Sequence, residues 1–285
     1  MLARQRQALI LDRVRQDGAA RVAELARELG VSDMTVRRDL EILHEKGLLE
    51  KVHGGATAIS SLAQFEPGFV AKLALQQAEK AAIAEAAADL VEPGMAIAIS
   101  AGTTTHVLAA RVAEIPGITV VTNSIRVAEV LHRTGRRDQT VILTGGVRTP
   151  SEALVGSFTV AQLRSIHVDL AFMGVHGMAA AAGFTCPNLH EADTDRAMIE
   201  AGQRLVVTAD SSKWGIIGIA SIARLDQADV LITDSGIDPA ALMVLRDTIR
   251  EVLVVEPDRT IEDELPALAI EGRGSSRAEV AVRAN

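Results

Sequence analysis

Residues 29–40 read LGVSDMTVRRDL, and this stretch carries the clearest structural signal in the chain. Gly30 tolerates the left-handed conformation that commonly ends a helix. Ser32, two residues later, is a favourable N-cap for a following helix. Apolar residues then recur at i, i+4 and i+7, a spacing that turns one helical face toward a core: Val36, Leu40 and Leu43. The stretch therefore predicts one helix ending, a tight turn and a second helix.

The flanking sequence completes a small module over residues 1–57. Apolar residues at helical spacing predict a first helix over residues 8–14, with Gly18 as its stop, and a second over 22–29. Gly47 closes the third helix. Residues 48–55 then alternate weakly and end in paired glycines, which indicates a β-wing. Three helices and a wing predict a winged helix-turn-helix, whose second motif helix enters the major groove of DNA.

Side chains suited to DNA lie on the predicted third helix and on the wing. Hydroxyl groups and guanidinium groups can bond phosphates or base edges. The candidates are Ser32, Thr35, Arg37 and Arg38 on the helix, with Lys51 and His53 on the wing. The alternative is an ordinary helical surface on which the two arginines form ion pairs with acidic neighbours. Those neighbours are Asp33, Asp39 and Glu41.

Charge is distributed unevenly along the 285 residues. Residues 1–56 hold ten Lys or Arg against nine Asp or Glu, a net charge of +1. Because the whole chain carries −8, residues 57–285 carry −9. Aromatic residues make up only 2% of the chain, which argues against sites built on stacked aromatic rings. Cys186 is the single cysteine, so an internal disulfide is excluded. No signal peptide or membrane span is apparent, and we expect a cytoplasmic protein.

The remainder of the chain predicts a second, larger domain. Seven short apolar runs alternate with helical stretches from residue 95 to residue 255, which predicts buried strands in an α/β domain with a mostly parallel sheet. The runs cover residues 95–99, 118–122, 141–144, 168–174, 204–209, 230–233 and 251–255. We expect a linker over residues 58–75, this domain over 76–257, and a mobile tail over 258–285.

Polar clusters follow several of these strands. Gly102 with Thr103, Thr104 and Thr105 comes directly after the first strand and opens a helix. Backbone N–H groups at a helix start, with hydroxyls beside them, make a socket for a phosphate, although the same residues also serve as simple caps. Other clusters end later strands, and such ends converge where open α/β sheets bind ligands: residues 122–124, 144–146, 174–177 and 210–213.

Residues 29–40, closed by VHGGA at 52–56, resemble the winged helix-turn-helix signature of the DeoR family of transcriptional repressors. The order of GTTT, TNS, GG, Glu191-Ala192 and DSSKWG resembles the sensor domain of the same family, so the likeness covers about residues 3–257. This resemblance implies a recognition helix against DNA, on which Asp39 orients an arginine. It also implies a second domain with the ribose-5-phosphate isomerase fold that senses phosphorylated sugars or similar metabolites.

By this resemblance the second domain holds a phosphorylated sugar or polyol. The phosphate is expected at Gly102 and Thr103 to Thr105, with Lys213 meeting its charge. The polyol is expected to face Asn123, Asp169, His176 and Glu191, with Gly145 and Gly146 also counted in the site. The chain departs from the family pattern at three positions, where many members carry Asp, Asp or Asn, and Lys respectively: Ser100, His176 and Asp195.

The sequence leaves two alternative interpretations of the second domain. A sugar-phosphate isomerase carrying a DNA-binding domain would use Glu191 or Asp169 as its base. A metal site would draw on Cys186, His190, Glu191 and His176, but that spacing is a thin signal. We predict a repressor of a carbohydrate catabolism operon, with no catalytic residue, cofactor or metal. We expect its effector to relieve repression, and the protein to act on paired DNA half-sites as a homo-oligomer, a dimer or tetramer.

Overall fold

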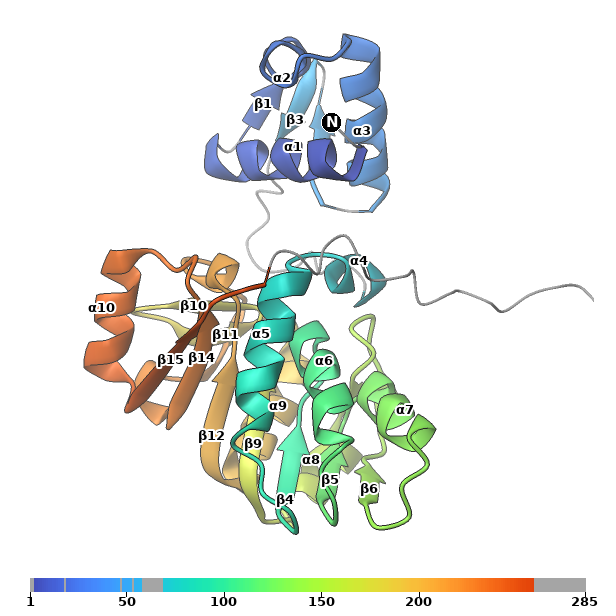
Figure 1. The fold of residues 1–285 in the computed structure, drawn as a ribbon, viewed down its shortest axis with the longest axis vertical. Helices are drawn as coiled ribbons and strands as arrows, with labels where there is room; N and C mark the ends of the chain where they lie inside the picture. The colour runs from blue at the N-terminus through green and yellow to red at the C-terminus, as the bar shows by residue number, and fades with distance from the viewer. Residues whose placement is uncertain (1–2, 18, 47, 53, 58–68, 259–285) are drawn as a thin grey trace, which may run out of the picture.

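The computed structural model describes residues 3–17, 19–46, 48–52, 54–57 and 69–258, which form two separately packed bodies (Figure 1). The N-terminal body contains three helices and a small antiparallel sheet. The helices are α1 (Ala3–Asp17), α2 (Val22–Leu29) and α3 (Asp33–Glu45). The strands, in the order β1-β3-β2, are β1 (Ala19–Arg21), β3 (Gly55–Thr57) and β2 (Glu50–Val52). The predicted helices and wing are therefore present.

Local sequence explains the sharp corners of this body. Gly30 ends α2 with a φ of +65°, a left-handed conformation that glycine adopts without penalty. The wing contributes a close approach: a Cβ on Gly55 would lie 2.3 Å from the carbonyl oxygen of Ala20 on β1. Strand β1 itself was not expected, because three residues without an apolar alternation give little signal. The core is formed by buried apolar residues that include Ile10, Val14, Leu25, Val36, Leu40, Leu43 and Leu49.

The C-terminal body is built on a seven-stranded sheet in which every neighbouring pair is parallel. Its strands correspond to the seven apolar runs of the sequence. In spatial order they are β15 (Glu251–Val255), β14 (Val230–Asp234), β12 (Gly202–Thr208), β9 (Val168–Gly174), β4 (Ala96–Ile99), β5 (Thr119–Thr122) and β6 (Thr140–Leu143). The α/β fold class is confirmed.

Helices cover both faces of this sheet, as expected for parallel strands that are buried on two sides. One face packs against α5 (Gln77–Ala88), α6 (Thr103–Val112) and α7 (Ile125–Arg133). The other packs against α8 (Ser157–Leu163), α9 (Leu189–Ala201) and α10 (Pro239–Thr248). The sheet residues alternate accordingly: Ile97 and Ile99 belong to the first apolar cluster, and Ala98 between them belongs to the second.

Short strands outside the main sheet were not expected. A three-stranded antiparallel sheet contains β10 (Gly177–Ala179), β11 (Gly183–Cys186) and β13 (Ala220–Ala223), and a hairpin pairs β7 (Val147–Arg148) with β8 (Leu154–Val155). Their runs of two to four residues are too short for a periodic signal. The run at 141–144 was expected to be a buried strand, but β6 lies at the edge of the sheet and exposes three of its four residues.

The segment before α5 contributes a further helix, α4 (Phe69–Leu73), inside the region expected to be linker. Short 3-10 turns follow β12 at Ser211–Lys213 and β13 at Leu225–Gln227. The expected linker residues 58–68, and the expected tail from residue 259 onward, lie outside the described residues. Across the described ranges, no helix has both the length and the apolar composition needed to cross a membrane.

Candidate functional site

Two features of the structure have the chemistry of a site, and the first is the exposed face of α3. Ser32 caps this helix: its Oγ accepts a hydrogen bond from the backbone N–H of Thr35 at 3.2 Å and lies 2.9 Å from the Thr35 hydroxyl. Val36, Leu40 and Leu43 are buried in the core as expected. The opposite face of the helix is therefore fixed toward solvent.

Arg37 and Arg38 lie exposed on α3, and within the described part of the chain neither forms an ion pair. Two of the three acidic residues considered as their partners, Asp39 and Glu41, are engaged elsewhere. Asp39 is buried, where its carboxylate accepts hydrogen bonds from Arg6 Nε at 2.5 Å and Gln7 Nε2 at 2.9 Å. Asp39 thus does orient an arginine, but one on α1.

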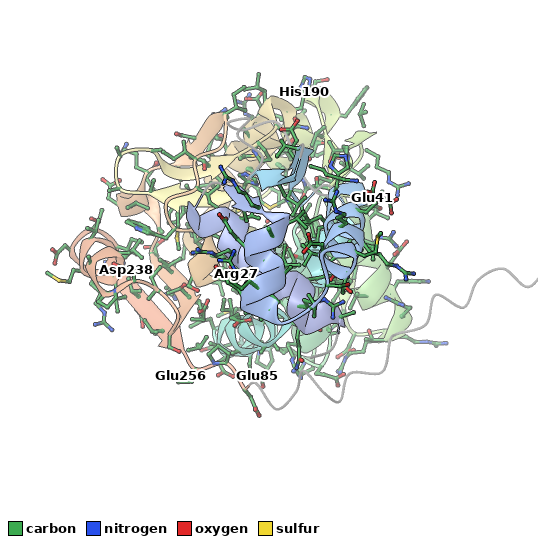
Figure 2. The ribbon with its side chains drawn as sticks, turned by 90° about the horizontal axis from the view of Figure 1, so that it is seen from above. Arg27, Glu41, Glu85, His190, Asp238 and Glu256 are labelled. Carbon is green, nitrogen blue, oxygen red and sulfur yellow. The ribbon has the colours of Figure 1, made fainter. Side chains whose placement is uncertain are left out.

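The wing meets α3 through an ion pair between Lys51 and Glu41. This contact holds the pKa of Glu41 below its ordinary value. Figure 2 looks onto the N-terminal body, with Arg27 of α2 and Glu41 of α3 labelled. His53, the other wing residue expected to contact DNA, lies outside the described residues.

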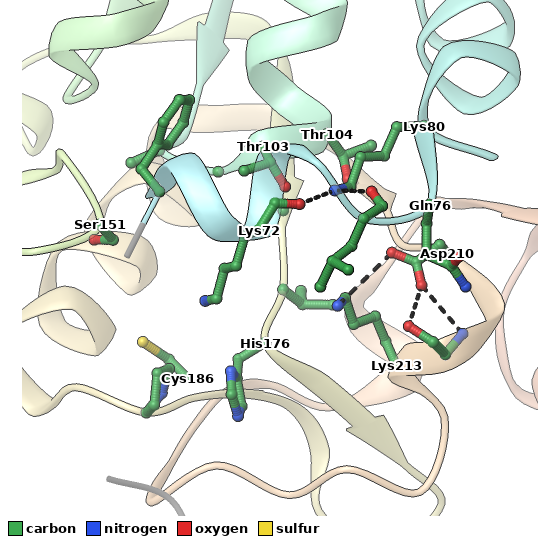
Figure 3. A pocket seen from close by; sticks show the side chains of 18 of the residues that line it. Lys72, Gln76, Lys80, Thr103, Thr104, Ser151, His176, Cys186, Asp210 and Lys213 are labelled. Atoms are coloured by element: carbon green, nitrogen blue, oxygen red, sulfur yellow. Dashed lines mark hydrogen bonds and ion pairs between the residues drawn. The ribbon is translucent and has the colours of Figure 1, made fainter. Parts of the chain in front are cut away.

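The second feature is a pocket of about 170 Å³ at the carboxyl ends of β4, β9 and β12 (Figure 3). Six of the residues expected at a ligand site line it: Gly102, Thr103, Thr104, His176, Glu191 and Lys213. The segment after β4 supplies one wall, because α6 begins there with Gly102 as its N-cap. Glycine has no side chain to cap the helix, so the first-turn N–H groups lie without a side-chain cap beside the pocket.

Five expected residues do not line the pocket. Thr105 is fully buried and donates its hydroxyl to the carbonyl oxygen of Gly102 at 3.1 Å. Asn123 is also buried: its Oδ1 accepts from the N–H of Ala101 at 3.0 Å, and its Nδ2 donates to the carbonyl oxygen of Leu154 at 3.3 Å. These two side chains hold the loop that forms the pocket wall, and neither lines the pocket itself.

The other three lie away from the pocket because of the sheet's topology. Gly145 and Gly146 follow the edge strand β6, which is separated from β4 by β5. Asp169 is the second residue of β9, at the amino end of the strand, where its carboxylate accepts a hydrogen bond from the N–H of Ala96 at 2.9 Å. The pocket lies beyond the other end of β9, so Asp169 is not among the residues that line it.

Two lysines that were not among the residues expected at the ligand site also line the pocket. Lys72 lies on α4, and Lys80 lies on α5. Lys80 is almost fully buried and donates to the carbonyl oxygens of Lys72 and Leu75, the latter at 2.6 Å (Figure 3). Burial lowers the pKa of Lys80 to about 8. Two isolated lysines beside a linker give no signal in a sequence, because they resemble ordinary surface residues.

His176 is kept neutral by its surroundings. Burial, followed by the positive charges of Lys72 and Lys213, lowers the pKa of His176 to about 4. Figure 3 shows Lys72, His176 and Lys213 around the same space. Lys213 also lies 3.7 Å from the carboxylate of the fully buried Asp210. The sequence placed the cluster at 210–213 among those that converge on a ligand site but gave a role only to Lys213; Asp210 and Ser212 also line the pocket.

Carboxylates also line the pocket. Glu191, at the start of α9, accepts a hydrogen bond from the hydroxyl of Ser151, and the thiol of Cys186 lies 4.0 Å from its other oxygen. Asp195, one turn further along α9, also lines the pocket. Of the three positions at which the chain departs from the family pattern, His176 and Asp195 therefore face the pocket. Ser100 does not: it is buried and accepts from the N–H of Gly174 at 3.0 Å.

In the part of the chain that the structure describes, no group of three or more His, Cys, Asp or Glu side chains could hold a metal ion. His190, one of the residues considered for metal binding, lies instead at a groove between α8 and α9. The pocket thus offers cations, hydroxyls, carboxylates and the uncapped start of a helix, which suit a ligand with an anionic group and several hydroxyls.

Comparison with known proteins gives matches over most of the chain. The DeoR-like helix-turn-helix domain matches residues 6–62, and the DeoR C terminal sensor domain matches residues 75–235. The putative aga operon transcriptional repressor of Escherichia coli O157:H7 is 32% identical over 253 residues, covering 88% of this chain and 93% of that protein. The HTH-type transcriptional regulator GolR of Listeria innocua is 35% identical, covering 88% and 98%.

Among solved structures, ribose 5-phosphate isomerase A from Methanocaldococcus jannaschii aligns with a TM-score of 0.36 and 16% sequence identity. The alignment covers 47% of this chain and 53% of that chain.

Proposed function

Because the chain belongs to the DeoR family of transcriptional regulators, we propose that it represses a carbohydrate catabolism operon by binding double-stranded operator DNA through α3. A phosphorylated sugar or polyol in the pocket would release the DNA. Such a regulator would act in the cytoplasm, on chromosomal DNA. The observation that carries the proposal is the pocket itself, where the uncapped start of α6 lies in the same space as Lys72 and Lys213.

The face of α3 supports the DNA-binding half of the proposal. Helix-turn-helix proteins insert the N-terminal part of their second motif helix into the major groove. Here that part presents Arg37 and Arg38 to solvent, and a guanidinium fork suits both phosphate and the O6 and N7 atoms of guanine. Because residues 1–56 carry a net charge of only +1, affinity must depend on a few well-placed side chains.

The residues that line the pocket support the proposal that it binds a phosphorylated sugar or polyol. Backbone N–H groups at a helix start, reinforced by lysine, bind a phosphate through charge-assisted hydrogen bonds. Carboxylates accept hydrogen bonds from hydroxyl groups, and Glu191 and Asp195 line the same pocket. His176, neutral at pH 7, retains one nitrogen that donates and one that accepts, as a polyol requires.

A strap, defined here as residues 69–76, links the pocket to the DNA-binding domain along the chain. In the sequence, residues 58–68 separate it from the wing. It lines the pocket through Phe69, Lys72, Leu75 and Gln76. Phe69 is held by an edge-on contact with the His106 ring, at 5.3 Å between centroids. A ligand that contacts Lys72 therefore acts on the segment that carries the DNA-binding domain.

Relief of repression also sets an energetic requirement. Moving DNA-competent occupancy from 99:1 to 1:99 requires a ligand preference of about 5.5 kcal/mol for one state. In a homo-oligomer, this free-energy difference is summed over the ligand sites of several subunits. Paired half-sites in DNA also favour a symmetric oligomer. We therefore propose that the chain acts as a dimer or tetramer.

We propose binding without turnover. The curated relatives are named as transcriptional regulators, and of the two carboxylates that an isomerase alternative would use, Asp169 lies at the far end of β9 from the pocket. Glu191 remains in the pocket, where it accepts a hydrogen bond from Ser151. A coupled-enzyme isomerase assay on the purified chain should give no turnover above background, and turnover at ordinary enzymatic rates would restore the enzyme alternative.

A thermal-shift screen against sugar and polyol phosphates tests the pocket. We expect at least one compound to raise the melting temperature of the wild-type chain. The double variant Thr103→Val with Lys213→Gln should lose this stabilisation, because it removes a hydroxyl and a cation from the phosphate wall. A matched double variant, Thr248→Val with Lys46→Gln, changes exposed residues outside the pocket and should keep it. Equal stabilisation of both variants would place the ligand elsewhere.

A further inference from the structure

Met34 is an outlier on the DNA-facing side of the N-terminal domain. It is the second residue of α3, and 74% of its surface is exposed. A single exposed apolar residue is ordinary on a protein surface. The position of this one is informative, because it lies at the end of the helix that enters the major groove in helix-turn-helix proteins.

Helical geometry places Met34 at the centre of the exposed face. At 100° per residue, Met34 points opposite the buried stripe of Val36, Leu40 and Leu43. Arg37 and Arg38 follow at i+3 and i+4, so the three side chains are neighbours on one face. The face thus combines two guanidinium groups with one flexible apolar group at its N-terminal end.

The major groove offers one apolar feature to such a side chain. Each base pair presents hydrogen-bond donors and acceptors there, and thymine alone adds a C5 methyl group. Methionine is unbranched and polarizable, so it adapts to small apolar surfaces. We propose that Met34 is a specificity-determining residue that contacts a thymine methyl in the operator, beside the base pairs reached by Arg37 and Arg38.

This inference rests on the proposed function, and its test separates the two. Full-length protein is first used to select a binding fragment from a random DNA pool. Each thymine of the fragment is then replaced, one at a time, by 2′-deoxyuridine, which removes only the methyl group and preserves base pairing. We expect replacement at one position of each half-site to weaken wild-type binding about fourfold, the scale of burying one methyl-sized group.

The variant Met34→Ala should bind the unmodified fragment more weakly and lose its sensitivity to that replacement. The matched control Met243→Ala changes a methionine on α10 that is 68% exposed, close to the 74% of Met34, and should retain the wild-type sensitivity. Arg38→Ala should also retain it while weakening binding to the unmodified fragment. Thermal unfolding of each variant verifies that the domain is folded.

Two results overturn the inference while the proposed function stands. One is tight, selective binding by the wild-type chain with no position sensitive to deoxyuridine. The other is a sensitive position whose penalty persists in Met34→Ala. Failure of the random pool to yield any selectively bound fragment would overturn the proposed function, and the inference with it.

Discussion

His176 lies at a point in the pocket where a proton is strongly disfavoured. Burial removes water from the imidazole, and Lys72 and Lys213 repel the positive charge that protonation would add. The folded-state pKa, about 4, is below the ordinary value of 6.5. Below pH 6.5 the unfolded chain therefore binds a proton that the folded chain does not, and stability falls as the pH decreases.

We expect His176→Gln to reduce this sensitivity to acid. Between pH 7.5 and pH 5, the wild-type free energy of unfolding should fall by up to about 2 kcal/mol more than that of the variant, at about 1.36 kcal/mol per pKa unit. The single tryptophan, Trp214, adjoins Lys213 and reports unfolding of the C-terminal domain by fluorescence during urea titration. Parallel pH dependences for the two proteins would show that the pKa of His176 is not lowered.

At the scale of elements, the junction between the strap and α5 is held in an unusual conformation. Gln76, the N-cap of α5, has a φ of +50°, in the left-handed region that disfavours side chains with a Cβ. The buried ammonium of Lys80 supports this turn by donating to the carbonyl oxygens of Lys72 and Leu75. The strap is thus fixed by contacts that also border the pocket, which suits a segment that responds to a ligand.

Glycine at this position should relieve the backbone strain. Gln76→Gly is expected to raise the free energy of unfolding by up to about 1 kcal/mol, the scale of the left-handed penalty. Gln77→Gly is the matched control: at the first residue of α5, where φ is not positive, glycine relieves no strain and should not raise stability. Urea denaturation monitored through Trp214 compares the two. Equal losses in both variants would show that Gln76 is not strained.

At the scale of the whole molecule, local signals in the sequence predicted the fold class, whereas only some of the residues expected at a ligand site line the pocket. Gly30 and Ser32 define a turn through their own conformational preferences, and the central runs of the main sheet are apolar because helices bury both faces of those strands. Lys72 and Lys80 meet the pocket only through tertiary packing, which leaves no local pattern. They could not have been assigned from the sequence.

Asp169 lies apart from the pocket for a different reason. The predicted strand over residues 168–174 already placed this residue at the amino end, whereas a ligand site was expected at the carboxyl ends. The role that the resemblance implied for Asp169 takes no account of strand direction. Gly145 and Gly146 lie away from the pocket for a related reason: the order of strands in the sheet, which no single strand encodes, places β6 at the edge.

The central claim is that occupancy of the pocket controls affinity for DNA. The direct measurement is fluorescence anisotropy of a selected DNA fragment with the full chain, titrated with a phosphorylated sugar or polyol that raises its melting temperature. The claim predicts that the ligand weakens DNA binding by the wild-type chain, while Thr103→Val with Lys213→Gln binds the DNA and does not respond. DNA affinity that stays unchanged at ligand concentrations saturating the thermal shift would contradict it.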